Sequence, residues 1–505
     1  MPSPPDPGSL LAVWDRSGYG PDQVVARDST GGLTAAALQQ ESAVLAAALQ
    51  LLGIKVLALQ ADNGIPWLVI DLACQQADIC LIPLPEYFSS GQLQHVFDLA
   101  AVDAVICQQA EQLQRVLGDR IQQQLPFQPG DLTLLKLRAV PGGSALPAQT
   151  GKITFTSGST GQPKGVCLAN AQLLLQARAL SRAVNIVAPR HLCLLPLSTL
   201  LENVAGLYAP LLSGGELIIP SLGEIGFVGS SELNAQKFLS TIQHYQPNSI
   251  ILTPQLLLIL VNAAATGWQA PPSLRFVAVG GGKVSYKLLQ QAVELGIPAF
   301  EGYGLSECAS VVSLNTPAQN RPGSCGQPLP HVQVQINDGE VVVTGNAMLG
   351  YLGEPESYGV STIQTGDLGE IDAQGYLHIN GRRKNLLISS FGRNINPEWV
   401  ESELLSQPLL SECVVMGDAR PYCVALLTPR QQVTSDLVIQ QHIDQVNTGL
   451  PDYAQVKRWH RLKRPLSAQA GLLTANGRPQ RPAIAEQYAG LLTSLYPEPF
   501  ELESA

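Results

Sequence analysis

Charged side chains are scarce in this chain of 505 residues: Asp, Glu, Lys and Arg make up 14% of it, while 45% of the residues are hydrophobic. Such a composition is typical of a globular protein that buries large sheets. The net charge of -10 gives no electrostatic support for a nucleic-acid partner. At this length we expect two or more domains, because one core is seldom so large.

Cysteine pairs and long apolar runs are also lacking. The nine cysteines include no Cys-x-x-Cys pair, which favours free thiols in a reducing compartment over a zinc site or a disulfide framework. The start, Met1 to Gly8, has no basic region followed by an apolar core, so we do not expect it to be a signal peptide. The most apolar run, Ile250–Ala265, is broken by Pro254 and predicts a buried helix, not a transmembrane segment. We therefore expect a cytoplasmic protein.

Short apolar strands alternate with helical segments in the first half of the chain. Strands are predicted at Lys55–Gln60, Ile79–Leu84 and Ala104–Cys107. This alternation predicts parallel βαβ units with helices on both faces of a sheet. A second alternating set, from Leu192 to Val279, predicts another doubly wound sheet, and the Gln-rich residues 109–150 are expected to be a connector.

Closely spaced strands and turns follow between Val311 and Ile379. The turn sequence Asn337-Asp-Gly339 lies between two apolar runs and favours an antiparallel hairpin. This region is expected to form a small β-barrel or sheet. The last 120 or so residues alternate helices with short strands and predict a small α+β domain.

A loop rich in glycines and hydroxyls follows an apolar strand within Ile153–Gly165. Glycines let backbone amides approach an anion, hydroxyls donate to phosphate oxygens, and Lys164 adds a positive charge. The glycines and hydroxyls are Thr156, Ser157, Gly158, Ser159, Thr160, Gly161 and Gly165. Pro163 before Lys164 does not fit the P-loop of mononucleotide kinases. The segment predicts a phosphate-binding loop, although a surface loop has a similar composition.

Residues 156–165 resemble the phosphate loop of the acyl-adenylating (AMP-binding) superfamily, which includes acyl-CoA synthetases, peptide-synthetase adenylation domains and firefly-type luciferases. Four more stretches follow in that family's order, namely Tyr303–Glu307, Thr365–Asp367, Gly381–Glu401 and Asn476–Arg481. The resemblance implies an α/β fold with a large N-terminal domain, residues 1–383, of two doubly wound sheets plus a small β-barrel at 311–380. A small mobile α+β C-terminal domain, residues 384–505, would follow.

The resemblance also implies roles for single residues. Lys164, Thr160, Glu307 and Arg478 would be catalytic, and Glu307 would bind Mg²⁺. The phosphate-loop residues from Thr156 to Lys164 would bind the nucleotide together with Gly281, Gly282, Tyr303, Gly304, Ser306, Asp367 and Arg382. Tyr303 would stack on adenine, and Asp367 and Arg382 would contact the ribose. Lys384 would be the hinge, and Gly392 would lie on the loop that lines the pantetheine tunnel.

Three positions depart from the family pattern. Arg478 stands where the family has a lysine, and a planar guanidinium differs from a compact ammonium. Asn385 stands in place of an aspartate. In fatty-acyl relatives a histidine occupies the position of Thr199, while Glu202 is retained here.

The function that this resemblance implies is ATP-dependent activation of a carboxylic acid, a medium- or long-chain fatty acid, to an acyl-adenylate. Thioester formation with coenzyme A would follow, with ATP, Mg²⁺ and coenzyme A as the cofactors and co-substrates. Two alternatives stay open: an acyl-AMP ligase that loads an acyl carrier protein, and a regulatory protein of low turnover that binds adenylates. None of these readings involves a nucleic acid.

Overall fold

The computed structural model describes residue 10 and residues 18–128, 131–138, 143–157, 163–229, 232–474 and 477–496. No helix among these residues is long and apolar enough to cross a bilayer. The architecture is the predicted α/β arrangement, with two large sheets, a small antiparallel sheet and a smaller α+β part at the C-terminus.

The first large sheet has eight strands in the order β21-β9-β8-β4-β3-β5-β7-β6. Its strands are β3 Val56–Gln60, β4 Cys80–Pro83, β5 Ala104–Cys107, β6 Ile121–Phe127, β7 Leu132–Leu137, β8 Thr150–Ser157, β9 Pro163–Ala169 and β21 Gly350–Tyr351. The central strands are parallel, as predicted. Helices α2 Ala35–Leu51, α3 Ile65–Ala77, α4 Ser90–Leu99 and α5 Ala110–Leu117 belong to this part.

Residues 109–150 are more than the connector that we expected. They contain α5 and the antiparallel strands β6 and β7, which extend the sheet beyond β5. The three glutamines Gln122–Gln124 are exposed on β6, the last strand of the sheet. A polar strand at a sheet edge carries little of the apolar alternation by which strands are predicted.

The second large sheet has nine strands in the order β18-β17-β16-β15-β14-β10-β11-β1-β2. Its strands are β1 Val24–Asp28, β2 Gly31–Thr34, β10 Arg190–Leu192, β11 Glu216–Ile218, β14 Ser249–Leu252, β15 Phe276–Val279, β16 Ala299–Leu305, β17 Ser310–Leu314 and β18 Gln327–Pro328. Strands β1, β11, β10, β14, β15 and β16 run parallel to their neighbours in that order. The apolar run Ile250–Ala265 is thus a strand followed by a helix, divided at Thr253, whose side chain caps helix α10, Pro254–Ala265.

Further helices cover this sheet, and a two-stranded hairpin is attached to it. They are α6 Asn170–Val184, the π-helix Glu202–Tyr208, α7 Ala209–Leu212, α8 Leu222–Ile225, α9 Ala235–Tyr245, α10 Pro254–Ala265, α11 Tyr286–Glu294, and the hairpin β12 Phe227–Val228 with β13 Glu232–Leu233. One large core cluster contains residues of both sheets, so the two sheets share a hydrophobic interior.

The small antiparallel sheet has the order β19-β20-β22-β23. Its strands are β19 Gln333–Asn337, β20 Glu340–Thr344, β22 Thr362–Ile371 and β23 Leu377–Arg382. Asp338 and Gly339 have φ values of 49° and 77°, as the predicted two-residue hairpin turn requires.

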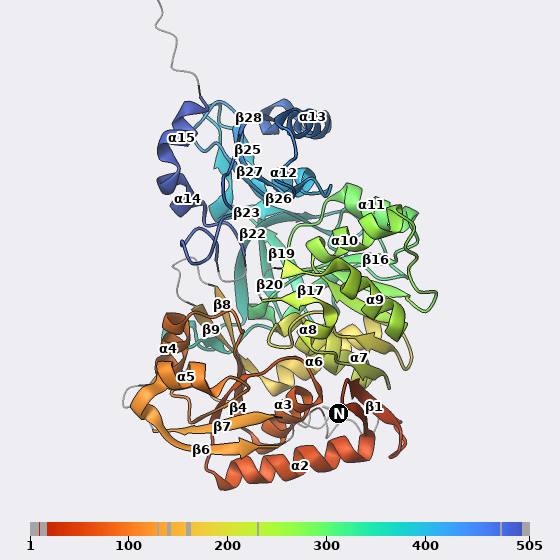
Figure 1. Ribbon diagram of the computed structural model, residues 1–505, viewed down its shortest axis with the longest axis vertical. Coiled ribbons are helices and arrows are strands. Elements are labelled where there is room, and N and C mark those ends of the chain that lie inside the picture. The colour runs from red at the N-terminus through yellow and green to blue at the C-terminus, as the bar shows by residue number, and fades with distance from the viewer. Residues whose placement is uncertain are drawn as a thin grey trace, which may run out of the picture.

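The C-terminal part has hydrophobic clusters of its own. Its elements are β24 Leu387–Ile388, β25 Asn394–Ile395, α12 Pro397–Leu404, β26 Leu410–Met416, β27 Cys423–Pro429, α13 Asp436–Asn447, β28 Val456–Arg461, α14 Arg481–Gln487 and α15 Ala489–Ser494. Figure 1 shows α2 at the bottom of the molecule, β20 and β22 near the middle, and α13 and α15 at the top.

Candidate active site

The predicted phosphate loop is the tip of the hairpin formed by β8 and β9. The two strands are antiparallel, with Thr156 opposite Lys164 and Ser157 opposite Pro163. The tip itself, with Gly158, Ser159, Thr160 and Gly161, lies outside the described residues, as does the side chain of Ser157. The structure therefore places the stem of the loop and leaves its tip as a prediction.

Lys164 and Glu307, both expected to be catalytic, meet the same tyrosine. The Lys164 ammonium lies 4.9 Å from the centroid of the Tyr351 ring and donates to Glu354 Oε1 at 2.7 Å. The Tyr351 hydroxyl donates to Glu307 Oε1 at 2.8 Å. Burial, with the negative charges of Glu307 and Glu354, raises the pKa of Tyr351, so its hydroxyl keeps the donating proton.

Tyr351 and Glu354 are site residues that the sequence motifs missed. The strand β21 is only two residues long, and Tyr351 reaches the site because β21 pairs with β9, where it lies opposite Val166. Two residues give no periodic pattern, so only a prediction of the pairing between distant strands could have found this tyrosine.

Glu307 offers a ligand of the type that Mg²⁺ prefers. It lies with Ser306 in the short 3-10 helix Ser306–Cys308, and its backbone oxygen accepts from Met348 N at 2.7 Å. The side chain is half-buried beside the Tyr351 hydroxyl. A hard carboxylate oxygen near the phosphate-loop strand fits a Mg²⁺ ion that is shared with substrate phosphates.

Asp367 on β22 is held from two sides by residues of the predicted nucleotide site. The Tyr303 hydroxyl donates to Asp367 Oδ2 at 2.6 Å, and Arg382 Nε lies 2.7 Å from Oδ1. Burial raises the pKa of Asp367, whereas the Arg382 charge and the Tyr303 hydrogen bond act in the opposite direction. Each carboxylate oxygen has two lone pairs, so Asp367 can still accept the ribose hydroxyls expected there.

Gly304 acts through backbone packing. A Cβ atom at this position would lie 1.8 Å from the backbone oxygen of Ser310 on the paired strand β17. No other residue fits there without moving that strand. Gly304 thus lets β17 approach β16 just after Tyr303.

Arg478 connects the C-terminal part with the carboxyl end of a strand in the second large sheet. Its Nη2 donates to the backbone oxygen of Gly281 at 3.0 Å, just beyond the carboxyl end of β15. Gly281 has a φ of 82°, and Gly282 follows it in the same turn. Burial raises the pKa of Asp367, and the charge of Arg478 opposes this rise together with that of Arg382, so the guanidinium interacts electrostatically with the cluster of Tyr303, Asp367 and Arg382.

Lys384 and Gly392 lie in different surroundings. Lys384 is in the 3-10 helix Arg383–Asn385, where loss of hydration and the charges of Arg382 and Arg478 lower its pKa. Gly392 lies in the hairpin of β24 and β25. Its φ is 71°, and a Cβ atom at this position would have no other atom within 4 Å. Figure 1 shows β25 among the C-terminal strands, whereas Arg478 contacts Gly281 beyond the end of β15.

Glu202 belongs to the interior of the molecule. It is fully buried, with Oε1 3.1 Å from His191 Nε2 and Oε2 accepting from Leu195 N at 3.3 Å. Cys193 lies beside this pair, and the three side chains together could bind a metal ion. Thr199, at the position of the family histidine, is exposed.

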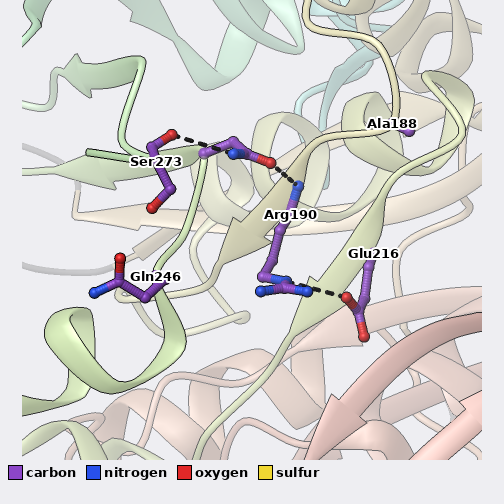
Figure 2. A pocket seen from close by; sticks show the side chains of 6 residues that line it. Ala188, Arg190, Glu216, Gln246 and Ser273 are labelled. Atoms are coloured by element: carbon purple, nitrogen blue, oxygen red, sulfur yellow. Dashed lines mark hydrogen bonds and ion pairs between the residues drawn. The ribbon is translucent and has the colours of Figure 1, made fainter. Parts of the chain in front are cut away.

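A surface cavity of about 320 Å³ is lined by none of the predicted site residues. Figure 2 shows it lined by Arg190, which pairs with Glu216, and by Gln246 and Ser273. Arg190 and Glu216 begin the parallel strands β10 and β11, whereas Gly281 follows the end of β15. The cavity therefore lies at the amino ends of the parallel strands, whereas α/β sheets bind ligands at the carboxyl ends of their strands.

The fold and the site define a class of adenylate-forming enzymes. The sequence profile of the AMP-binding enzyme family matches residues 14–352, and that of the AMP-binding enzyme C-terminal domain matches residues 384–499. The chain belongs to the AMP-binding enzyme family.

Relatives within the family act on different acids. The long-chain-fatty-acid–CoA ligase FadD15 of Mycobacterium bovis is 24% identical over 425 residues, which cover 68% of this chain and 69% of the relative. The 2-succinylbenzoate–CoA ligase of Bacillus subtilis is 29% identical over 287 residues, or 53% of this chain and 56% of the relative.

Solved structures share the fold along nearly the whole chain. The anthranilate CoA ligase AuaEII in complex with anthranoyl-AMP has a TM-score of 0.78 at 19% identity, covering 96% of this chain and 98% of its own. The O-succinylbenzoate coenzyme A synthetase MenE of Bacillus subtilis, in complex with AMP, has a TM-score of 0.74 at 21% identity, covering 99% and 98%.

Proposed function

We propose that the protein activates a carboxylic acid with ATP, forming an acyl-adenylate and pyrophosphate, and then transfers the acyl group to the thiol of coenzyme A. The observation that carries this proposal is the position of Arg478. It reaches from the C-terminal part to Gly281, beside Asp367, which is already bound by Tyr303 and Arg382. Membership in the AMP-binding enzyme family, and relatives that are named as acid–CoA ligases, support the same reaction.

The chemistry needs charge stabilisation more than it needs a side-chain nucleophile. A carboxylate oxygen attacks the α-phosphorus of ATP, and pyrophosphate leaves with the electrons of the broken P–O bond. Lys164 and Arg478 would balance the negative charge that builds on the phosphates. A Mg²⁺ ion held by Glu307 would supply further charge neutralisation when bound. Asp367 and Arg382 would orient the ribose.

For the acid we propose an apolar substrate, with a medium- or long-chain fatty acid first. Leu201 Cδ2 lies 3.6 Å from the place that a Cβ of Gly280 would occupy, at the end of β15 near Arg478. Leu201 and Ala205 are partly buried apolar residues that pack against two core clusters. Glu202 points away into its buried pair with His191. An apolar wall beside the reacting carboxylate suits an acyl chain or an aryl ring, and relatives of both kinds exist.

The second half-reaction would use another orientation of the C-terminal part. We propose that rotation about Lys384 withdraws Arg478 and brings the Gly392 hairpin to the same site. The exposed position of that hairpin is compatible with such a movement, since Phe391 at its tip is 76% exposed. The nine free, buried cysteines fit the reducing conditions of a cytoplasmic enzyme.

Release of AMP and pyrophosphate tests the proposal. Purified protein is incubated with ATP, Mg²⁺ and a panel of fatty and aryl acids, with and without coenzyme A. We expect AMP and an acyl-CoA thioester with at least one apolar acid. Adenylate without thioester would indicate a carrier-protein acceptor. ATP binding without AMP from any acid would overturn the proposal and favour the regulatory alternative.

A further inference from the structure

Tyr351 lies between two charged residues of opposite sign that are expected to handle the same nucleotide. Its hydroxyl donates to Glu307 at 2.8 Å, and its ring face carries the Lys164 ammonium at 4.9 Å. One side chain thus contacts the carboxylate expected to bind the metal and the lysine expected to bind phosphate. The three residues come from strand β21, the helix Ser306–Cys308 and strand β9, so tertiary folding and not sequence proximity brings them together.

The backbone around Tyr351 is fixed by contacts on both sides. Its amide donates to Ser357 Oγ at 2.8 Å, and the Leu352 amide donates to the Gly165 oxygen on β9 at 2.8 Å. Ser357 Oγ in turn donates to the Glu354 backbone oxygen at 2.6 Å. A hydroxyl that is anchored in this way can define the rotamer of the carboxylate it binds, because the donor itself has little freedom to follow.

We propose that Tyr351 is a positioning residue for the bound nucleotide: its hydroxyl orients the Glu307 carboxylate toward the metal, and its ring holds the Lys164 ammonium on the same side. The proposal rests on the proposed adenylation function. Tyr351 acts by holding the negative and the positive group at two separate points of one side chain, the hydroxyl and the ring face.

The hydroxyl and the ring make separable contributions. Tyr351→Phe removes the hydrogen bond to Glu307 and keeps the ring under Lys164. Tyr351→Leu removes both. We expect Tyr351→Phe to raise the Mg²⁺ concentration needed for half-maximal ATP binding by roughly 3- to 10-fold, since a hydrogen bond to a charged group is lost while water can partly replace it. ATP binding at saturating Mg²⁺ should recover in Tyr351→Phe but not in Tyr351→Leu.

Calorimetric titration of the whole protein with ATP at a series of Mg²⁺ concentrations tests this inference. The matched control is Tyr358→Phe, because the Tyr358 hydroxyl, seven residues along the same loop, donates at 3.0 Å to the backbone oxygen of Ala145 and not to Glu307. That variant should show the Mg²⁺ dependence of the wild type. A purely structural role would weaken binding equally at all Mg²⁺ concentrations.

Two results would overturn the inference: an unchanged Mg²⁺ dependence in Tyr351→Phe, or an equal loss at every Mg²⁺ concentration with no rescue. A failure of the proposed function can be distinguished from a failure of this inference. If only the proposed function fails, the wild type binds ATP with Mg²⁺ and releases no AMP with any acid, while Tyr351→Phe still shifts the Mg²⁺ concentration needed for ATP binding. Absence of Mg²⁺-dependent ATP binding in the wild type would reject both.

Discussion

The ammonium of Lys164 is held by the carboxylate of Glu354 at 2.7 Å, so the lysine expected to bind phosphate has an anionic partner within the protein. Both side chains are partly exposed, at 43% and 36%. Exposed ion pairs contribute little free energy, and the phosphates of ATP can therefore replace Glu354. Because Glu354 competes with ATP for Lys164, we expect Glu354→Gln to lower the KM for ATP by about 2- to 5-fold with kcat nearly unchanged.

Glu356→Gln is the control for this substitution. Glu356 is exposed two residues further along the same loop, and its substitution removes the same charge from the same region. Steady-state pyrophosphate release at varied ATP measures both variants. A lower kcat in Glu354→Gln would contradict the argument and would show that Glu354 positions Lys164 for the reaction.

Arg478 should matter for the first half-reaction alone. Its hydrogen bond to Gly281 places a positive charge beside the Asp367 cluster. We expect Arg478→Ala to reduce acyl-adenylate formation on the order of 100-fold, the typical cost of removing one group that stabilises developing charge. Conversion of preformed acyl-adenylate to thioester should be unaffected, because Arg478 would be withdrawn in that step.

The matched control is Arg458→Ala, an exposed arginine on β28 of the same C-terminal part. Rapid-quench measurement of each half-reaction separates the two steps. An equal loss in both half-reactions would mean that Arg478 holds the parts of the molecule together and does not serve adenylation specifically. Arg478→Lys should retain part of the activity, since it keeps the charge and loses the planar fork.

Gly392 gives the converse prediction. Gly392→Leu should spare adenylation and slow thioester formation by roughly ten-fold or more, because a bulky side chain would stand on the loop that approaches the thiol. The substitution also strains a residue with a φ of 71°. Gly471 has the same φ of 71° and open space around it, so Gly471→Leu carries the same strain elsewhere in the C-terminal part. Thioester formation that falls equally in both variants would argue against a role for the Gly392 loop.

The sequence motifs pointed to residues that interact with one another in the structure, and their roles in catalysis stay a prediction. These residues are Lys164, Tyr303, Glu307, Asp367 and Arg478, and 314 positions separate the first from the last. The motifs also included Gly304, which we expected to bind the nucleotide. The structure shows a different requirement for glycine at this position, because Ser310 approaches it closely, and the sequence does not reveal this packing contact.

Some features that depend on pairing between strands were not predicted. Tyr351 and Glu354 reach Lys164 through the pairing of β21 with β9, more than 180 positions apart. The strand β6 was missed because this exposed edge strand carries glutamines where a buried strand carries apolar residues. The strand β7 is apolar and largely buried, and it was missed because it lies within the segment that we expected to be a connector. In both cases tertiary contacts, and not local propensity, determine the structure.

We expect Glu301 on β16 to make the free energy of unfolding depend on pH. Its side chain is 4% exposed, and burial raises its pKa from 4.5 to about 7, opposed by the charge of Lys283. Because the folded state binds this proton more tightly than the unfolded state, the stabilisation is fully present below about pH 4.5 and is lost as the pH rises through about 7.

Glu301→Gln, which carries no charge at any pH, should remove this loss. We expect the variant to exceed the wild type in stability at pH 8 by roughly 1 to 3 kcal/mol, with little difference at pH 5. Thermal unfolding of both proteins at the two pH values measures the difference, in which contributions from the other groups cancel. Glu294→Gln, at an exposed position on α11, should track the wild type at both pH values. If Glu301→Gln does so too, the buried carboxyl is ionised in the folded protein at neutral pH, which would require Lys283 to compensate its burial in full.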